Sequence, residues 1–276
     1  MNPLIIARAV QFASCMTLLA IPVFARWIAP PGLPTGREAS ILEKRLRRLM
    51  AASVLLALFS AIAVYWMVAR SLIAETEAQW STLLTSTQFG RLFLIRLALI
   101  LAVGAATLCN STGLALVSGA CALGSLAWAG HAAASENSAL QIVVDSAHLL
   151  AAGIWPGALL PLTFYLAINR NEARRVVRRF STSSLIAVSV LAVTGCANAC
   201  FRLGTLDALL TTNYGRLLLL KIAFFLATIS IAACNLLYVI PRLETSFPRL
   251  KRNVAVELIL ALGILFVVGA LGLLPP

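Results

Sequence analysis

Apolar runs of about 20 residues recur along the whole chain and are separated by short polar connections. A helix of that length spans the roughly 30 Å hydrocarbon core of a bilayer. Because lipid offers no hydrogen bonds to backbone N–H and C=O groups, such runs fold as transmembrane helices. Only 12% of the residues are charged, about half of the share that is typical of a soluble domain. The sequence therefore predicts an all-α, polytopic membrane protein.

Eight transmembrane helices are expected, at residues 4–28, 50–72, 92–109, 112–130, 140–168, 182–202, 217–240 and 254–273. The first run is expected to be retained and not cleaved as a signal peptide, because it carries Arg8 at its start and Pro22 and Arg26 near its end. Residues 1–276 are expected to form a single transmembrane domain, with no room for a soluble domain.

The basic residues are distributed unevenly among the connections. Fifteen of the 22 Lys and Arg follow the first, fifth and seventh runs: Arg26, Arg37, Lys44, Arg45, Arg47, Arg48, Arg170, Arg174, Arg175, Arg178, Arg179, Arg242, Arg249, Lys251 and Arg252. Loops rich in Lys and Arg face the cytoplasm. With eight helices, both termini are then expected on the outer side. The same rule explains the net charge of +12 without nucleic acid as a partner.

The two histidines of the chain, His131 and His148, flank the connection between the fourth and fifth runs, which is expected on the outer side. His131 is expected at the outer end of the fourth helix and His148 about two turns into the fifth. Asp145 and His148 are spaced i, i+3 and share a helix face. The Asp145 carboxylate can therefore accept the ring N–H and orient the imidazole toward a metal ion. Since polar groups inside a bilayer are costly, these residues are functional candidates.

Further polar and sulfur-containing residues of the first, sixth and seventh helices are expected in the same outer half of the bilayer: Gln11, Cys15, Met16, Cys196, Asn198, Cys200, Tyr214 and Lys221. Imidazole with sulfur ligands suits copper, and Cu(I) in particular. Two histidines cannot build a three-histidine zinc site. The alternative for the cysteines and Met16 is packing, and Lys221 can instead reach the membrane surface with its ammonium group. Gln11, Asn198, Tyr214 and Lys221 are candidates to orient ligands or line a pathway.

Other intramembrane polar residues are expected to be structural. Asn235 is expected to form an interhelical hydrogen bond, and Glu257 to lie in the first turn of the last helix, where the helix dipole favours an acid. Pro156 and Pro161, with nearby glycines, predict a kinked fifth helix that a neighbour approaches closely. The chain has no GxxxxGK[ST] motif, so ATP-driven pumping is not expected, and neither is any enzymatic activity.

Several segments follow one another in an order that is characteristic of a known family. They are TQFGRLFLIR (87–96), GHA (130–132), HLLAAGIWPGALLPL (148–162), RFS (179–181), TGCANA (194–199), TNYGRLLLLK (212–221), VELILALG (256–263) and the terminal LLPP. Together they resemble the copper-resistance D family (CopD/PcoD) over nearly the whole chain. The resemblance implies a bacterial inner-membrane protein of copper homeostasis that moves copper from the periplasm toward the cytoplasm. It also implies a periplasmic copper-binding partner of the CopC type, a domain that is not expected within this chain.

The resemblance also assigns individual residues. His131 matches the histidine of the family's GHA motif, and His148 matches the histidine before the W-x-G segment, here Trp155 to Gly157. Trp155 thus becomes a candidate for the copper pathway. Pro156 departs from the family, since a bulkier apolar residue is usual there.

A second departure lies in the first helix, where Gln11 stands at a position that is frequently histidine in relatives. If that histidine is a copper ligand elsewhere, this chain has either a weaker site or a sulfur substitute such as Cys15 or Met16.

Two other functions stay open. One is a membrane redox protein that holds a single haem between the two histidines, although their different depths would require a tilted haem. The other is an assembly factor that delivers copper to a partner and transports nothing, which would need the same ligands.

Overall fold

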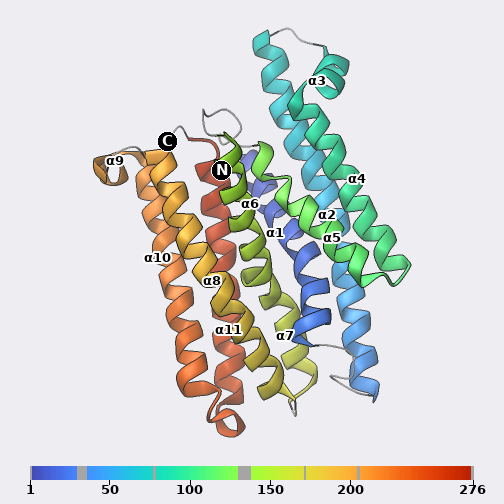
Figure 1. Ribbon diagram of the computed structural model, residues 1–276, viewed down its shortest axis with the longest axis vertical. Coiled ribbons are helices and arrows are strands. Elements are labelled where there is room, and N and C mark those ends of the chain that lie inside the picture. Colours follow the sequence, from blue (N-terminus) through green and yellow to red (C-terminus); the bar gives the residue numbers. More distant parts are fainter. Residues whose placement is uncertain are drawn as a thin grey trace.

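The computed structural model describes residues 2–29, 36–76, 79–129, 138–170, 172–203 and 206–274. Across these ranges the secondary structure is helical, without strands, and the helices pack side by side as a bundle (Figure 1). The predicted fold class, an all-α polytopic membrane protein, is confirmed.

The described residues of the first half of the chain form five helices and two short helical turns. They are α1 (Pro3–Val23), the π-helical turn η1 (Phe24–Ile28), α2 (Gly36–Thr76), α3 (Trp80–Ser86), α4 (Gln88–Leu108), α5 (Thr112–Gly124) and the 3-10 turn η2 (Ala127–Ala129). The second half contains α6 (Ser138–Ile154), the 3-10 turn η4 (Pro156–Ala158), α7 (Leu159–Ile168), α8 (Ala173–Leu203), α9 (Leu206–Thr211), α10 (Asn213–Cys234), the π-helical turn η5 (Asn235–Val239) and α11 (Leu243–Leu271).

Seven helical segments in the described part of the chain are long and apolar enough to cross a membrane: Pro3–Ile28, Gly36–Thr76, Gln88–Leu108, Ala139–Ile168, Ala173–Leu203, Asn213–Val239 and Leu243–Leu271. The expected count of eight is not confirmed. The run at 112–130 yields only α5, whose 13 residues extend about 20 Å at 1.5 Å per residue. In the turn before α5, Asn110 adopts a left-handed φ of 56°, which asparagine tolerates better than most residues.

Both ends of the chain lie at the same end of the bundle, while the connections from α7 to α8 and from α10 to α11 lie at the other (Figure 1). Arg8 in α1 donates a hydrogen bond to the carbonyl oxygen of Gly272, just after α11. At Gly269 an added Cβ would lie 2.7 Å from the carbonyl oxygen of Ile5, so α1 and α11 are in close contact. This arrangement agrees with the expectation that the two termini share one side of the membrane.

Helix α1 runs through the centre of the bundle and packs against α2, α5, α6 and α11. Its segment from Cys15 to Val23 is buried without interruption. Small residues allow the close packing: an added Cβ at Gly119 of α5 would lie 2.9 Å from the carbonyl oxygen of Leu18, and one at Gly157 would lie 3.1 Å from that of Met16. The predicted kink is confirmed, since the expected fifth helix breaks at Trp155 into α6, η4 and α7.

The last helix begins earlier than expected. Residues 243–253, which the sequence suggested were a cytoplasmic connection, continue as helix in α11, with Pro248 tolerated inside it. Glu257 therefore lies about four turns inside α11, and its expected place in the first helical turn is wrong. The other expectation for this region is confirmed, because Asn235 forms interhelical hydrogen bonds with residues of α11.

Candidate functional site

Polar side chains meet where α6 packs against α8, with α10 beside them. The cluster, called the outer cluster below, consists of Asp145 and His148 from α6, Thr194 and Arg202 from α8, and Tyr214 and Lys221 from α10. Four of these residues were expected to be functional, and Thr194 and Arg202 were not. Both lie in the TGCANACFR stretch at 194–202, so their presence in a transmembrane helix was itself a signal.

His148 is oriented by a hydrogen bond across the helix interface. Its Nδ1 lies 2.9 Å from Oγ1 of Thr194, and that hydroxyl in turn donates to the carbonyl oxygen of Val190 at 2.6 Å. A threonine hydroxyl has a single hydrogen, so toward the imidazole it acts as acceptor and Nδ1 is the donor. Nε2 then carries the lone pair, which is the form in which a histidine binds a metal ion.

Asp145 is engaged by an arginine and not by the histidine. Its Oδ2 accepts a hydrogen bond from Nη2 of Arg202 at 2.9 Å, and the two side chains are 14% and 30% exposed. The expected hydrogen bond from His148 to Asp145 is therefore absent. Instead, each residue bonds to a residue of α8: His148 to Thr194 and Asp145 to Arg202. The physical reason is that a charge-assisted pair with a guanidinium is stronger than a hydrogen bond from a neutral imidazole.

Two residues of α10 complete the outer cluster. Arg202 hydrogen-bonds the side chain of Tyr214, which is buried. Lys221 interacts electrostatically with Asp145, Arg202 and His148. Two cations thus share one carboxylate around a neutral imidazole. An excess of positive charge repels a divalent ion more strongly than a monovalent one, so these surroundings are less unfavourable to a monovalent cation.

The remaining candidate ligands lie elsewhere or outside the described residues. His131 falls in the part of the chain that is not described. Cys196 and Cys200 are exposed on α8, at about 200° and 240° around the helix from Thr194, and thus on a different face from the one that meets His148. Asn198 is partly buried on the same helix. Among the described residues, no three His, Cys, Asp or Glu side chains come together.

The candidates of α1 are deeply buried. Gln11, Cys15 and Met16 are 4%, 0% and 6% exposed, and Cys15 interacts electrostatically with Arg96 of α4. The Arg96 guanidinium donates to Oγ and to the carbonyl oxygen of Ser125, both at 2.9 Å. It thereby caps the C-terminal end of α5. No structural role was predicted for Arg96 from the sequence.

Five buried side-chain donors have no hydrogen-bond partner among the described residues, and two of them, Nε2 of Gln11 and Nε1 of Trp155, lie on α1 and directly before η4. The Trp155 ring is 1% exposed and meets the ring of Phe225 edge-on at 5.9 Å between centroids. Buried polar groups are normally satisfied, so these two N–H groups mark the interior next to α1 and η4 as a place where a polar ligand or water would be held.

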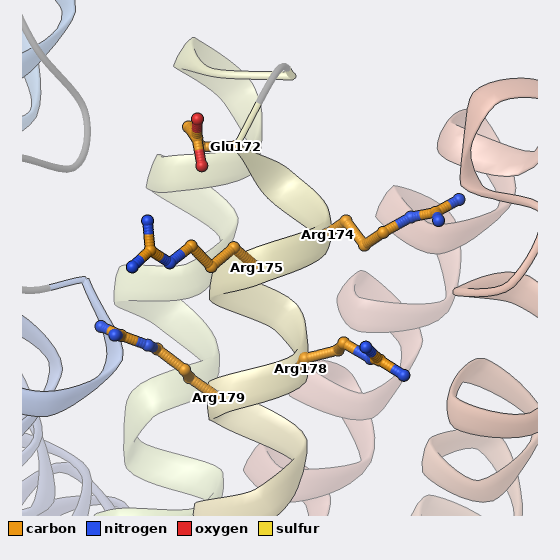
Figure 2. Close-up of a pocket in the computed structure, with 5 residues that line it drawn as sticks. All are labelled: Glu172, Arg174, Arg175, Arg178 and Arg179. Atoms are coloured by element: carbon orange, nitrogen blue, oxygen red, sulfur yellow. The ribbon is translucent and has the colours of Figure 1, made fainter.

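A second polar surface lies at the first turns of α8. A pocket of about 390 Å³ is lined by Glu172, Arg174, Arg175, Arg178 and Arg179. Figure 2 shows Arg175 and Arg179 pointing to one side of α8, and Arg174 and Arg178 to the other. Since arginines stay cationic, this surface does not bind metal cations. It fits the phosphate-bearing edge of a cytoplasmic leaflet, as expected from the charge distribution.

The fold and the outer cluster define a polytopic helical membrane protein with a polar cluster between α6, α8 and α10. Residues 1–142 match the family model described as copper resistance protein D-like, N-terminal domain, and residues 174–271 match that of copper resistance protein D. The chain belongs to the copper resistance protein D family, and a role in copper resistance follows from this membership.

Named relatives agree with this assignment. The chain is 26% identical to copper resistance protein D of Pseudomonas syringae pv. tomato over 308 aligned residues, covering 100% of this chain and 97% of the relative. It is 29% identical to the inner membrane protein YebZ of Escherichia coli (strain K12), over 86% of this chain and 84% of the relative. Copper transport protein CutJ of Bacillus subtilis (strain 168) is 33% identical over 45% of this chain and 24% of its own length. No solved structure matches the chain.

Proposed function

We propose that the protein moves copper ions through the bacterial inner membrane, from the periplasm toward the cytoplasm, and that His148 is a copper ligand in the outer half of the bundle. The observation that carries the proposal is the hydrogen bond from Nδ1 of His148 to Thr194, which leaves Nε2 available. The ion is Cu(I), because a neutral imidazole in positively charged surroundings suits a soft monovalent cation better than Cu(II).

His131 is proposed as the second imidazole ligand of the copper ion. Sulfur ligands come from Cys15 and Met16 or from Cys196 and Cys200. The burial of Cys15 and Met16 on α1, the helix that also carries the unsatisfied amide of Gln11, favours the first pair. A periplasmic copper-binding protein of the CopC type delivers the ion to the outer side of the bundle. The protein is a transporter without an enzymatic reaction of its own.

Copper binding and copper movement are tested separately. Detergent-purified protein is titrated with Cu(I) against a chromophoric chelator, and the same protein is then placed in liposomes that contain the chelator. The proposal predicts a tight site that depends on His148, followed by copper entry into the liposomes. Tight binding without entry would identify a delivery factor. A Soret band in the purified protein would identify a haem protein instead.

A further inference from the structure

A second polar cluster lies in the cytoplasmic half of the bundle and takes no part in the proposed copper site. Its centre is Glu257 of α11, whose side chain is 2% exposed. Nδ2 of Asn235 donates to Oε1 of Glu257 at 2.7 Å. Nδ2 of Asn253, in turn, donates to Oδ1 of Asn235 at 2.7 Å. These three residues, called the inner cluster below, form one directed chain of hydrogen bonds that ends at a carboxyl group.

The backbone beside the inner cluster is irregular. Asn235 opens the π-helical turn η5, in which the N–H of Ile240 bonds to the carbonyl oxygen of Asn235 at 2.9 Å. The turn closes the C-terminal end of α10, a place where π-turns are common. Asn235 thus lies where α10 ends, and its amide meets both Asn253 and Glu257 of α11.

No described cation neutralises the Glu257 carboxyl. The elements packed against α11 are α10, η5, α1, α7 and η4, and their charged side chains are Arg8, Arg216 and Lys221. Arg8 bonds to Gly272 and Arg216 to Leu210, while Lys221 belongs to the outer cluster. On α11 itself, the charged residues Glu244, Arg249, Lys251 and Arg252 are exposed.

A carboxylate in such a place is costly, because a buried charge needs a partner charge or a coordinated ion. The donor set argues against a metal ion. Asn235 presents its N–H group to the carboxyl, and its oxygen is occupied by Asn253, whereas hard cations require several oxygen ligands and Cu(I) prefers sulfur or imidazole. A proton satisfies the carboxyl with no further ligand.

We propose that Glu257 binds and releases a proton during the transport cycle, and that the inner cluster couples copper movement to the proton gradient. In the acid form one carboxyl oxygen carries the proton, and Oε1 accepts the Asn235 N–H. On release the proton passes to water on the cytoplasmic side, and the carboxylate keeps the Asn235 hydrogen bond, which is stronger to an anion. This inference rests on the proposed function, because it supplies the driving ion for it.

The two clusters are separated along the membrane normal. Lys221 of the outer cluster and Asn235 of the inner one are 14 positions apart in the same helical segment, or about 21 Å at 1.5 Å per residue. Copper and the proton would therefore occupy different depths. They would be linked through α10 and through α11, which packs on both α10 and the central α1.

The decisive variant is Glu257→Gln, which keeps an oxygen that accepts the Asn235 hydrogen bond but cannot bind or release a proton. Glu257→Asp serves as its matched control, because it retains a carboxyl group. Copper uptake is measured in proteoliposomes under imposed pH gradients of either sign, with the membrane potential clamped and with sodium or choline as the bulk cation.

For one coupled proton, a gradient of one pH unit changes the final copper ratio of the wild type by about tenfold, since each unit corresponds to a factor of ten in the proton's driving force. The Glu257→Gln variant is expected to lose this response and to keep its Cu(I) affinity, while Glu257→Asp keeps the response. The inference is overturned if Glu257→Gln follows the gradient as the wild type does, or if the wild type ignores the gradient or follows sodium.

A second measurement does not depend on copper movement. Infrared difference spectra recorded across a pH titration contain carbonyl bands from every acidic residue that titrates, so the wild-type spectrum is compared with that of Glu257→Gln. The wild type should contain one additional band of a protonated carboxylic acid, which the variant lacks. If the wild type moves no copper but shows the band, the proposed function fails while the proton site stands. If the band is absent from the wild type, the proton site fails whatever the copper assay shows.

Discussion

The outer and inner clusters solve the same physical problem in opposite ways. In the outer cluster, the Asp145 charge is paired with Arg202 across the α6–α8 interface, and the groups are only partly buried. In the inner cluster, the Glu257 carboxyl is almost completely buried and accepts a hydrogen bond from the neutral amide of Asn235, which in turn accepts one from Asn253. Asp145 therefore has to stay ionised, because its negative charge balances the positive charge of Arg202. Among the described residues Glu257 has no such partner charge, so its carboxyl can gain or lose a proton without breaking an ion pair.

The largest effect on stability is expected in the outer cluster. Asp145→Ala leaves Arg202 and Lys221 as two cations without a carboxylate. We expect a loss of about 1–3 kcal/mol in the free energy of unfolding, less than for a fully buried pair because Arg202 is partly exposed. Thermal unfolding in detergent measures it. Adding Arg202→Gln to Asp145→Ala should recover part of the loss, and a double variant less stable than either single one would contradict the pairing.

The next effect is on copper affinity. Thr194→Val preserves the shape of the buried side chain and removes the acceptor for Nδ1 of His148. Loss of a partner that orients a metal-binding histidine weakens metal affinity about 10- to 100-fold. We expect a decrease of this size in the Cu(I) affinity of Thr194→Val. Thr194→Ser, which keeps the hydroxyl, should bind as the wild type does. Equal affinity of the valine and serine variants would show that the Thr194 bond does not prepare the histidine.

A smaller effect is expected in the inner cluster. Glu257→Gln keeps the hydrogen-bond acceptor and removes only the capacity to ionise, so its free energy of unfolding should lie within about 0.5 kcal/mol of that of the wild type. Asn235→Leu, in contrast, should cost about 1–3 kcal/mol, because it leaves buried polar groups without partners. If the glutamine variant were as unstable as the leucine variant, the Glu257 charge would be structural and the contrast between the clusters would disappear.

The smallest effect concerns the exposed cysteines of α8. Since Cys196 and Cys200 lie on a different face from Thr194, replacing both by serine should change Cu(I) affinity by less than about twofold. Chelator competition measures this, with Cys15→Ser as the contrasting variant. A large loss of affinity in the double variant would restore the two cysteines as ligands.

Much of the fold was predictable because lipid forces long apolar runs into helices. The errors lie where polar residues continue a helix or an apolar run ends early. Residues 243–253 contain charges and Pro248, and thus resemble a loop, although they form the start of α11. In the run at 112–130 the α-helix ends at Gly124, where Arg96 hydrogen-bonds Ser125. That contact joins residues 29 positions apart, and no local pattern reveals it.

The helix that carries Asp145 and His148 was predictable, but the residues that they contact were not. The spacing of Asp145 and His148 correctly put them on α6, yet their partners Thr194 and Arg202 come from α8, and only the packed bundle shows which helix faces them. The helical angle between Thr194 and the two cysteines could have been computed from sequence. The sequence alone does not show that the face of α8 that carries Thr194 packs against α6.

The most direct test of the account is the Cu(I) affinity of His148→Ala, measured by chelator competition on detergent-purified protein. Ser189→Ala, an exposed change on α8, serves as the control. The account predicts that the alanine variant loses the tight site, with affinity falling by more than the 10- to 100-fold expected for Thr194→Val, while the control binds as the wild type does. Unchanged affinity of His148→Ala would contradict the assignment of His148 as a copper ligand, and with it the proposed site.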